Sequence, residues 1–232
     1  MDKILEIHKL SAGYGPLRVL HEIDLSLNKG ERIGLVGLNG HGKTTLIRAI
    51  THMTEWQQGS IKFDGIEIGG NRSFGAGRRT ASIVRKGISV APQGDAIFPG
   101  LTVRQHLHCG AFSKTAWNEK ENRINKIFEI FTPLKKLEHV LVGKLSGGER
   151  RMVSIGRMLM EEAKLYLIDE PTLGLAPKIY SSLLNAIWSL NLKNSSMIIA
   201  EQNVGLLSKN VDRLIGIYAG KLRGEVGHVE LK

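Results

Sequence analysis

The chain has 232 residues, of which 42% are hydrophobic, so it can bury a substantial core and fits one domain, or one domain with an inserted subdomain. Its 32 lysines and arginines exceed its 22 aspartates and glutamates, which gives a net charge of +10. This charge is compatible with an anionic partner, such as a nucleotide, a nucleic acid or a lipid surface, and equally with a solvated basic surface.

The cysteine content and the apolar pattern exclude several classes of protein. The single cysteine, Cys109, excludes an internal disulfide framework, a CxxC metal site and a thiolate cluster, and it favours a reducing compartment. No apolar stretch approaches the roughly 18 residues of a membrane-spanning helix, and the N-terminal MDKILEIHKL alternates apolar and polar residues, unlike a secretory leader. We therefore expect a soluble chain that contacts a membrane only through a partner.

The N-terminal part is predicted to consist of β-strands around one helix. ILEIHKL and RVLHEIDLSL alternate as strands do, and the turn NKGE precedes the apolar run RIGLVG. From Thr44 the pattern changes to helical spacing, and GSIKFDGIEIGG and GISVAPQ then predict a hairpin and a short strand. The apolar residues at helical spacing in TTLIRAITHM are Leu46, Ile47, Ile50 and Met53.

The C-terminal part is predicted to alternate between helices and buried strands. In NEKENRINKIFEIF, Asn118 is the expected helix cap, with Glu121 three residues on, and the expected apolar face is Ile124, Ile127, Phe128 and Phe131. KLYLID and SSMIIAEQ are apolar runs on either side of PKIYSSLLNAIWSL, which starts with a proline suited to a first helical turn. This alternation predicts an α/β fold with a parallel sheet and a helical insert at residues 95–159.

Residues Gly37 to Thr44 fit the pattern G-x-x-x-x-G-K-[ST], whose glycines let backbone N–H groups turn around phosphate oxygens. Lys43 adds a positive charge at the β and γ phosphates, Thr44 offers a hydroxyl to Mg²⁺, and the following helix directs its positive dipole end at the anion. The alternative is a glycine-rich turn that precedes a lysine. His41 is expected to be a solvent-facing spacer that acts only through its backbone. The residues expected around the phosphates are Gly37, Leu38, Asn39, Gly40, His41, Gly42, Lys43, Thr44 and Thr45.

The run LYLIDEP brings two acidic residues to the end of an apolar strand, where open parallel sheets bind their ligands. Asp169 is expected to hold Mg²⁺ or its waters. Glu170 is expected to polarise a water molecule for in-line attack on the γ phosphate. An acidic turn that merely ends a core strand is the alternative, and the upstream phosphate loop favours the functional interpretation.

The stretch KLSGGERRMVSIGRMLM predicts a second anion site. Ser146 and two glycines open a helix, so a hydroxyl, N–H groups and a helix dipole converge on one point. One nucleotide does not need two such sites from one chain, and we infer that the second site covers a nucleotide held by another chain. The expected contact residues there are Ser146, Gly147, Gly148 and Glu149, and the expected apolar face of the helix is Met152, Ile155, Met158 and Leu159.

LSGGE, the phosphate loop, LYLIDEP and APQG together resemble the nucleotide-binding subunit of an ATP-binding cassette (ABC) transporter over essentially the whole chain. The resemblance implies a single P-loop ATPase domain over residues 1–232, with an N-terminal antiparallel β part and a mixed or parallel sheet with flanking helices. The core would span about residues 1–94 and 160–232, and the helical subdomain at 95–159 would carry the signature. It also implies two cassettes that enclose two ATP molecules with Mg²⁺.

The resemblance assigns roles to further residues. Tyr14 in SAGYG would stack on adenine. Gln93 would meet Mg²⁺ or the attacking water and border the groove that receives a coupling helix of the membrane subunit. PTLGLAPK departs from the common family pattern at Ala176, where aspartate is usual. The switch histidine is replaced by Gln202, whose amide can donate to the γ phosphate but does not titrate near neutral pH, so we expect switching without a histidine titration.

EQN, LGLAP and IFPGLTV are most similar to the second ATPase of branched-chain amino acid importers and of their urea and amide relatives. This similarity implies a second ABC ATPase subunit, identical or related, as partner. It also implies two transmembrane permease subunits, a periplasmic or lipid-anchored solute-binding protein, and a place at the cytoplasmic face of the inner membrane. An exporter ATPase shares every catalytic motif and stays open.

Two other functions fit the sequence less well. A nucleotide kinase or P-loop GTPase would leave LSGGE unexplained. A nucleic-acid ABC ATPase would suit the positive charge, but the stretch between Gln93 and Leu145 is too short for the long coiled coil of those proteins, so no nucleic acid is expected as a partner.

Overall fold

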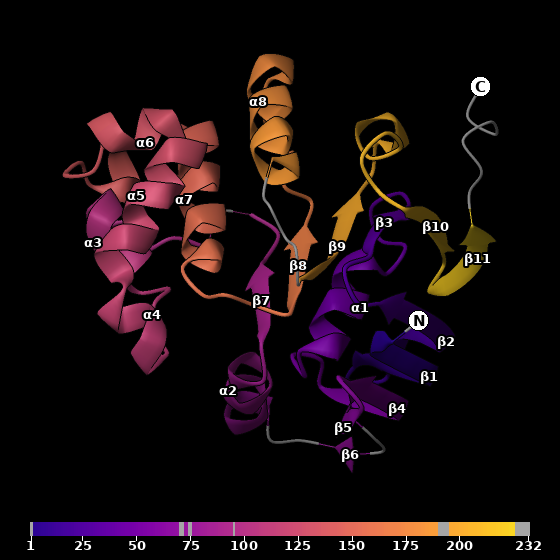
Figure 1. Cartoon of the computed structure of the whole chain (residues 1–232). Helices are drawn as coiled ribbons and strands as arrows, with labels where there is room; N and C mark the ends of the chain where they lie inside the picture. The colour runs from indigo at the N-terminus through magenta and orange to yellow at the C-terminus, as the bar shows by residue number, and fades with distance from the viewer. Residues whose placement is uncertain (1, 70–71, 74–75, 95, 190–194, 226–232) are drawn as a thin grey trace. The chain divides into compact units, whose positions relative to one another are not determined.

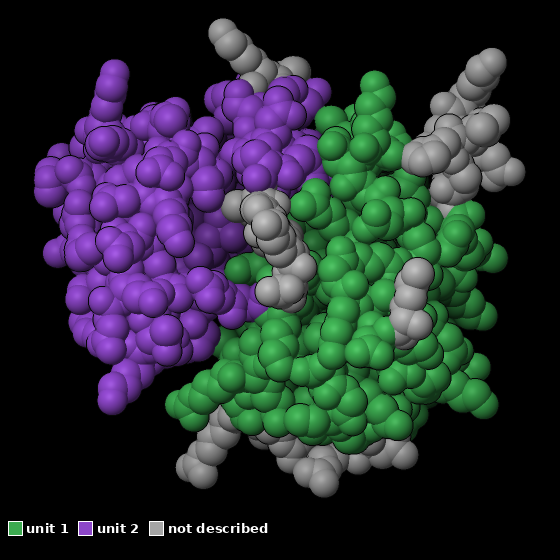
Figure 2. Space-filling model, viewed as in Figure 1, with its two compact units in different colours: residues 1–88, 164–169, 192–232 green, residues 89–163, 170–191 purple. Residues whose placement is uncertain are grey.

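The computed structural model describes residues 2–69, 72–73, 76–94, 96–189 and 195–225 (Figure 1). The chain divides into two compact units, coloured separately in Figure 2, and each is described by itself. Within the described ranges no helix is long and apolar enough to cross a membrane. Unit 1 comprises residues 1–88, 164–169 and 192–232, and unit 2 comprises 89–163 and 170–191.

The helical subdomain expected at residues 95–159 lies within the range of unit 2, although residue 95 itself is outside the described residues. Unit 2 additionally includes residues 89–94, 160–163 and 170–191, which were expected in the core. A compact unit and a subdomain are different divisions of a chain, so the expected subdomain bounds stay a prediction.

Unit 1 contains an antiparallel sheet in the order β2-β1-β4-β5, with β6 also paired to β4. The hairpin predicted from GSIKFDGIEIGG is formed by β4 and β5 and turns at Asp64 and Gly65, whose φ angles are 48° and 76°. Two consecutive positive φ angles are typical of the tight turns that suit the twist of a hairpin. The strands are β1 (Lys3–Tyr14), β2 (Leu17–Asn28), β4 (Trp56–Phe63), β5 (Ile66–Gly69) and β6 (Arg72–Ser73).

A second sheet has the order β11-β10-β3-β9-β8-β7. Strands β10, β3, β9 and β8 are parallel, and β11 is antiparallel to β10. All residues of β8 and β9 are buried, which explains why both read as continuous apolar runs. The strands are β3 (Arg32–Val36), β7 (Ile88–Ala91), β8 (Leu165–Asp169), β9 (Ser196–Glu201), β10 (Arg213–Tyr218) and β11 (Lys221–Glu225).

Helix α1 (Lys43–Ile50) packs against β1 and β2 of the antiparallel sheet and against β8 of the parallel sheet. Its residues Leu46, Ile47 and Ile50 are buried, as predicted. Met53 was predicted on the same face, but this prediction is wrong. The helix ends at Ile50, and His52 has a φ of 57°, so Met53 leaves the helical path and is 50% exposed. Unit 1 also contains α2 (Ala76–Arg85).

Unit 2 contains the remaining α-helices. As predicted, α5 buries Ile124, Ile127 and Phe128, and Phe131 directly after it is buried too. The helices are α3 (Val103–His108), α4 (Lys114–Asn118), α5 (Lys120–Ile130), α6 (Thr132–Lys136), α7 (Gly147–Leu159) and α8 (Pro177–Trp188), with a short 3-10 helix η1 (Val142–Lys144). In unit 1 a second 3-10 helix, η2 (Val204–Leu206), follows β9.

Of two predicted helix starts, one is wrong and one is confirmed. Asn118 is not a cap: it is the last residue of α4, because the Ser113 side chain caps an earlier helix by accepting from the Ala116 N–H at 3.1 Å. Helix α8 begins at Pro177 as predicted. Its expected last residue, Leu190, and the end of the hairpin at Gly70 lie outside the described residues.

Gly59 on β4 occupies a crowded irregularity of the sheet. The register of β1 against β4 shifts between His8 and Ser11, and Gly59 opposite this shift has a φ of 98°. A Cβ atom at Gly59 would lie 2.4 Å from the Lys9 carbonyl oxygen and 2.6 Å from that of His8. The position therefore combines a left-handed backbone with a close approach of two strands.

We predict that Gly59→Ala lowers the free energy of unfolding by about 2–4 kcal/mol, because backbone strain and a steric clash add. The matched control is Gly65→Ala, since Gly65 also has a positive φ (76°) but has open space around a Cβ. It should lose only about 1–2 kcal/mol. Urea unfolding followed by circular dichroism measures both. Equal losses in the two variants would contradict the clash.

Candidate functional site

Three neighbouring parallel strands of unit 1 end at the same edge of the sheet (Figure 1). Strand β9 lies between β3 and β8, with Val36 paired to Glu201 and Asp169 paired to Ala200. The phosphate loop follows β3, Asp169 ends β8, and Gln202 follows β9. This edge therefore brings together three of the predicted site elements, of which the phosphate loop is more than a hundred residues from the other two in the chain.

The loop from Gly37 to Gly42 owes its path to its glycines. Gly40 and Gly42 have φ angles of 82° and 106°. At Gly37 a Cβ would lie 2.4 Å from the Ile217 carbonyl oxygen of β10. Between these glycines, Leu38 is 57% exposed and Asn39 is also exposed. The backbone thus forms an exposed bend directly before α1, as a phosphate-binding loop requires.

Lys43 directs its charge back into this loop. The residue is only 3% exposed, and its Nζ donates to the carbonyl oxygens of Gly37, at 2.7 Å, and Leu38, at 3.1 Å. Lys43, Thr44 and the buried Thr45 form the first turn of α1, which contains no acidic residue. An ammonium group, a hydroxyl and the positive end of a helix dipole therefore share one location, which favours an anion.

His41 was predicted to be a solvent-facing spacer, and this is wrong. The residue is half-buried, and its ring lies 4.7 Å from the Tyr218 ring in an edge-on arrangement. Its backbone oxygen also accepts from the Gly220 N–H at 3.0 Å. The imidazole therefore contacts the last residue of β10, and the ring has a packing role that the loop pattern does not reveal.

In unit 2, the Gln93 side chain contacts Glu170 directly. Gln93 Nε2 donates to Glu170 Oε2 at 2.8 Å; Gln93 is exposed, whereas Glu170 is 4% exposed. Glu170 has a φ of 44°, which is a strained conformation for a residue with a side chain. A strained, buried carboxylate with an amide donor is suited to hold a water molecule in a fixed orientation.

Arg151 on α7 was not identified from the sequence, although it lies among these residues. It is 3% exposed; its Nη1 donates to the carbonyls of Pro92, at 2.7 Å, and Gly94, and its Nε donates to the Pro171 carbonyl at 3.2 Å. It therefore joins the backbone on both sides of Gln93 to the residue after Glu170. A sequence signal existed, because Arg151 is four residues before the buried Ile155 and so lies on the apolar face.

The helix α7 begins at Gly147, as predicted, and Ser146 caps it. Ser146 Oγ accepts from the Glu149 N–H at 3.4 Å, while the Glu149 carboxylate accepts from the N–H and the Oγ of Ser146, both at 2.8 Å. At Gly148 a Cβ would lie 2.6 Å from the Ile179 side chain, so a glycine permits α8 to approach. The predicted apolar face is buried at Met152, Ile155 and Met158, with Leu159 partly exposed.

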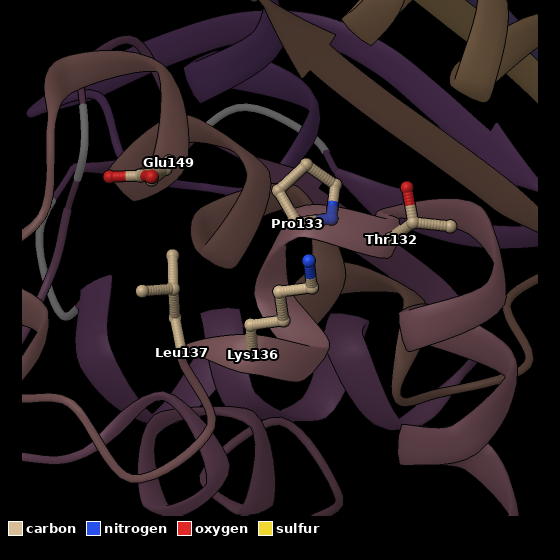
Figure 3. Close-up of a pocket in the computed structure, with 5 residues that line it drawn as sticks. All are labelled: Thr132, Pro133, Lys136, Leu137 and Glu149. Carbon is tan, nitrogen blue, oxygen red and sulfur yellow. The ribbon is translucent and has the colours of Figure 1, made fainter.

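A surface pocket of about 510 Å³ lies beside this cap (Figure 3). Glu149 of α7 lines it, together with residues of α6 and its C-terminal end. The lining side chains from that region are Thr132, Pro133, Lys136 and Leu137. The same carboxylate that caps α7 thus also borders an open pocket that carries both charges.

The segment after Gln93 contains a buried histidine. His106 on α3 is fully buried, and its Nε2 lies 3.5 Å from Arg157 Nη1. Burial lowers the pKa of His106 to about 4, and the positive charge of Arg157 contributes to the same shift. The ring of Phe98, which is 51% exposed, lies 5.4 Å from the imidazole. His106 is therefore neutral near pH 7 and packs as an aromatic ring.

Comparison with known proteins identifies the same family that the motifs resemble. The family model described as "ABC transporter" matches residues 20–173. The chain is 35% identical, over 94% of its length and 91% of the relative, to the high-affinity branched-chain amino acid transport ATP-binding protein BraG of Pseudomonas aeruginosa. It is 33% identical, over 87% of its length and 82% of the relative, to the probable branched-chain amino acid transport ATP-binding protein LivF of Archaeoglobus fulgidus.

A solved structure shares the fold over nearly the whole chain. It is a nucleotide-free ATP-binding cassette from an ABC transporter, and it matches with a TM-score of 0.77 and 28% identity over 96% of this chain and 90% of that one. The expected fold class, a cassette core with an antiparallel N-terminal sheet, a parallel sheet and flanking helices, is confirmed by this match and by the two sheets of unit 1.

For Arg151→Met we predict a loss of about 2–4 kcal/mol in the free energy of unfolding, because three backbone carbonyl groups lose the donor of a buried side chain. Arg151→Gln keeps an amide donor and should lose less. The matched control is Arg150→Met on the same helix, whose guanidinium donates to the Leu145 carbonyl at 3.1 Å. It should lose about 1 kcal/mol or less. Urea titration compares the three variants, and equal values for Arg151→Met and Arg150→Met would contradict the bridging role.

Proposed function

Since the chain belongs to the ABC transporter family of ATP-binding proteins, we propose that it hydrolyses ATP to power the import of branched-chain amino acids or closely related solutes. The observation that carries this proposal is the pair of similarities to branched-chain amino acid transport ATP-binding proteins, which extend over most of both chains. The edge of β3, β9 and β8 supplies the chemistry, because it collects a phosphate loop, a carboxylate and an amide.

The phosphates of ATP bind along the loop from Gly37 to Thr45. Backbone N–H groups and the N-terminus of α1 donate to the phosphate oxygens, and the Lys43 ammonium, already inside the loop, neutralises the β and γ phosphates. Tyr14, at the end of β1, stacks on the adenine ring. Each contact uses a group whose position is fixed by a strand end or a helix start.

Mg²⁺ would be held by the Thr44 hydroxyl and the Asp169 carboxylate, both of unit 1. These hard oxygen donors fit the ion, which is usually bound by one or two carboxylates together with substrate phosphates. Helix α1, which carries Thr44, packs against β8, which ends at Asp169. When bound, the ion supplies charge neutralisation at the β and γ phosphates.

Glu170 acts as the general base that orients and polarises the attacking water. Its carboxylate is buried and receives the Gln93 amide, so Gln93 determines how the carboxylate is oriented. Gln202 donates its amide N–H to the γ phosphate at the place where most relatives of this fold use a histidine. Because an amide does not titrate, this contact is independent of pH near neutrality.

A second cassette completes each site. The capped N-terminus of α7, with Ser146 through Glu149, covers a nucleotide held by the partner ATPase, which is a second copy or a related chain. Two transmembrane permease subunits and an extracytoplasmic solute-binding protein complete the transporter, and this chain lies at the cytoplasmic face of the membrane. Closure and reopening of the two cassettes drive the permeases.

We predict that Glu170→Gln reduces ATP hydrolysis at least about 100-fold, because the general base is lost. ATP binding should change little, since the proposed role of Glu170 is to orient the attacking water and not to bind the phosphates. The variant should accumulate as an ATP-bound dimer on gel filtration, with the partner ATPase present if the pair is unlike. A variant that fails to bind ATP, or that hydrolyses it at the normal rate, would contradict the assignment.

The solute is tested in the intact transporter. Cells that carry Glu170→Gln in the chromosomal gene should lose most high-affinity uptake of radiolabelled leucine, while uptake of proline through other carriers serves as the control. Unchanged leucine uptake together with lost urea or amide uptake would assign the chain to that related class of importer.

A further inference from the structure

The turn that follows Tyr14 is short and exposed. Tyr14 is the last residue of β1, and the chain returns through Gly15 and Pro16 to Leu17, which begins β2 and pairs with Tyr14. Gly15 has a φ of 49° with open space around a Cβ. Tyr14, the proposed base-stacking residue, therefore lies next to a turn whose backbone groups are not bound by the pairing of β1 with β2.

Two adjacent residues at the start of β4 bind both backbone groups of Gly15. The Glu55 carboxylate accepts from the Gly15 N–H at 2.6 Å, and the Trp56 indole N–H donates to the Gly15 carbonyl oxygen at 3.0 Å. The first bond is charge-assisted, so it is the stronger of the two. Both backbone polar groups of Gly15 are thus hydrogen-bonded. These bonds fix the orientation of the peptide unit after Tyr14.

Trp56 is itself held in place by two contacts. The guanidinium of Arg18 on β2 lies 5.7 Å from the centre of its ring, as in a cation–π interaction. On the other strand, Gly13 pairs with Trp56, and a Cβ at Gly13 would lie 2.7 Å from Trp56 Cζ2. The indole therefore lies close against the β1 backbone one residue before Tyr14.

The tip of the Tyr14 side chain is buried. The residue is partly exposed, but its hydroxyl oxygen is buried and has no hydrogen-bond partner among the residues that the structure describes. Part of the Tyr14 residue thus remains accessible, as contact with a flat ligand requires. Its direction then depends on the backbone at Tyr14 and Gly15, which Glu55 and Trp56 hold.

We propose that Glu55 and Trp56 are positioning residues that set the affinity of this chain for the adenine base, by holding the turn that orients Tyr14. The inference rests on the proposed function, because it requires adenine to stack on Tyr14. Neither residue touches the phosphates. Loss of the clamp therefore weakens the binding of a nucleotide with a base and leaves the binding of a bare polyphosphate unchanged.

The test compares ATP with inorganic tripolyphosphate as ligands of the full-length chain, both with Mg²⁺, by isothermal titration calorimetry. Trp56→Phe keeps an aromatic ring for Arg18 but removes the N–H donor, and Glu55→Ala removes the acceptor. Each should raise the Kd for ATP roughly three- to tenfold, as expected for the loss of one hydrogen bond, with the Kd for tripolyphosphate unchanged. Glu55→Gln retains an acceptor oxygen and should stay within about twofold of the parent chain.

Two further variants distinguish the possible outcomes. Trp117→Phe alters a tryptophan of unit 2 that is 52% exposed, and it should change neither Kd. Tyr14→Ala should weaken ATP binding at least as much as the clamp variants. If Tyr14→Ala weakens ATP but Trp56→Phe and Glu55→Ala do not, the clamp is overturned and the nucleotide site stands. If Tyr14→Ala has no effect, or the parent chain does not bind ATP, both the clamp and the proposed adenine contact are overturned. Equal weakening of ATP and tripolyphosphate by the clamp variants reflects general damage and also overturns the inference.

Discussion

The parallel pairing of β3, β9 and β8 is the constraint on which the phosphate-binding edge depends. Parallel strands carry their carboxyl ends to the same side of a sheet, so the pairing of the strands itself places the loop after β3, Asp169 and Gln202 at one edge. The strands are held by burial, since every residue of β8 and β9 is inaccessible. Polar chemistry at the edge is therefore supported by an apolar sheet that tolerates little change.

In unit 2 the equivalent organisation is made by hydrogen bonds to backbone carbonyls. Arg151 reaches from α7 to the chain on both sides of Gln93 and to Pro171, directly after Glu170. The helix that Ser146 caps is therefore connected through one side chain to the backbone beside Gln93 and Glu170, the proposed general base. A displacement of α7 would be transmitted to the backbone around Gln93 and Glu170, because the guanidinium is buried and its bonds are directional.

The sequence predicted most elements because their patterns are local. The alternation in the first strands, the apolar runs of β8 and β9 and the face of α5 each follow from burial on one or both sides. The misplaced Met53 and Asn118 arose at helix ends, where a single residue such as His52 or Ser113 decides where the chain turns. The pattern of apolar residues does not specify at which residue a helix ends.

The site was predictable to the extent that its chemistry lies in contiguous motifs. Gly37 through Thr45, Asp169 and Ser146 through Glu149 could be named because phosphate binding imposes residue types at fixed spacing. The packing of His41 against Tyr218, and the contacts of Arg151, join segments far apart in the chain, so no local pattern specifies them. Arg151 showed only an indirect signal, a charge on an apolar face.

Lys43 prepares the loop to bind an anion. Its ammonium is already desolvated and shared between the carbonyl oxygens of Gly37 and Leu38, so the chain has gathered its positive charge during folding. The positive charge is therefore preorganised, and the protein needs little rearrangement to bind a polyphosphate. This keeps the entropic cost of binding low. Folding of the sheet therefore also preorganises the loop for its ligand.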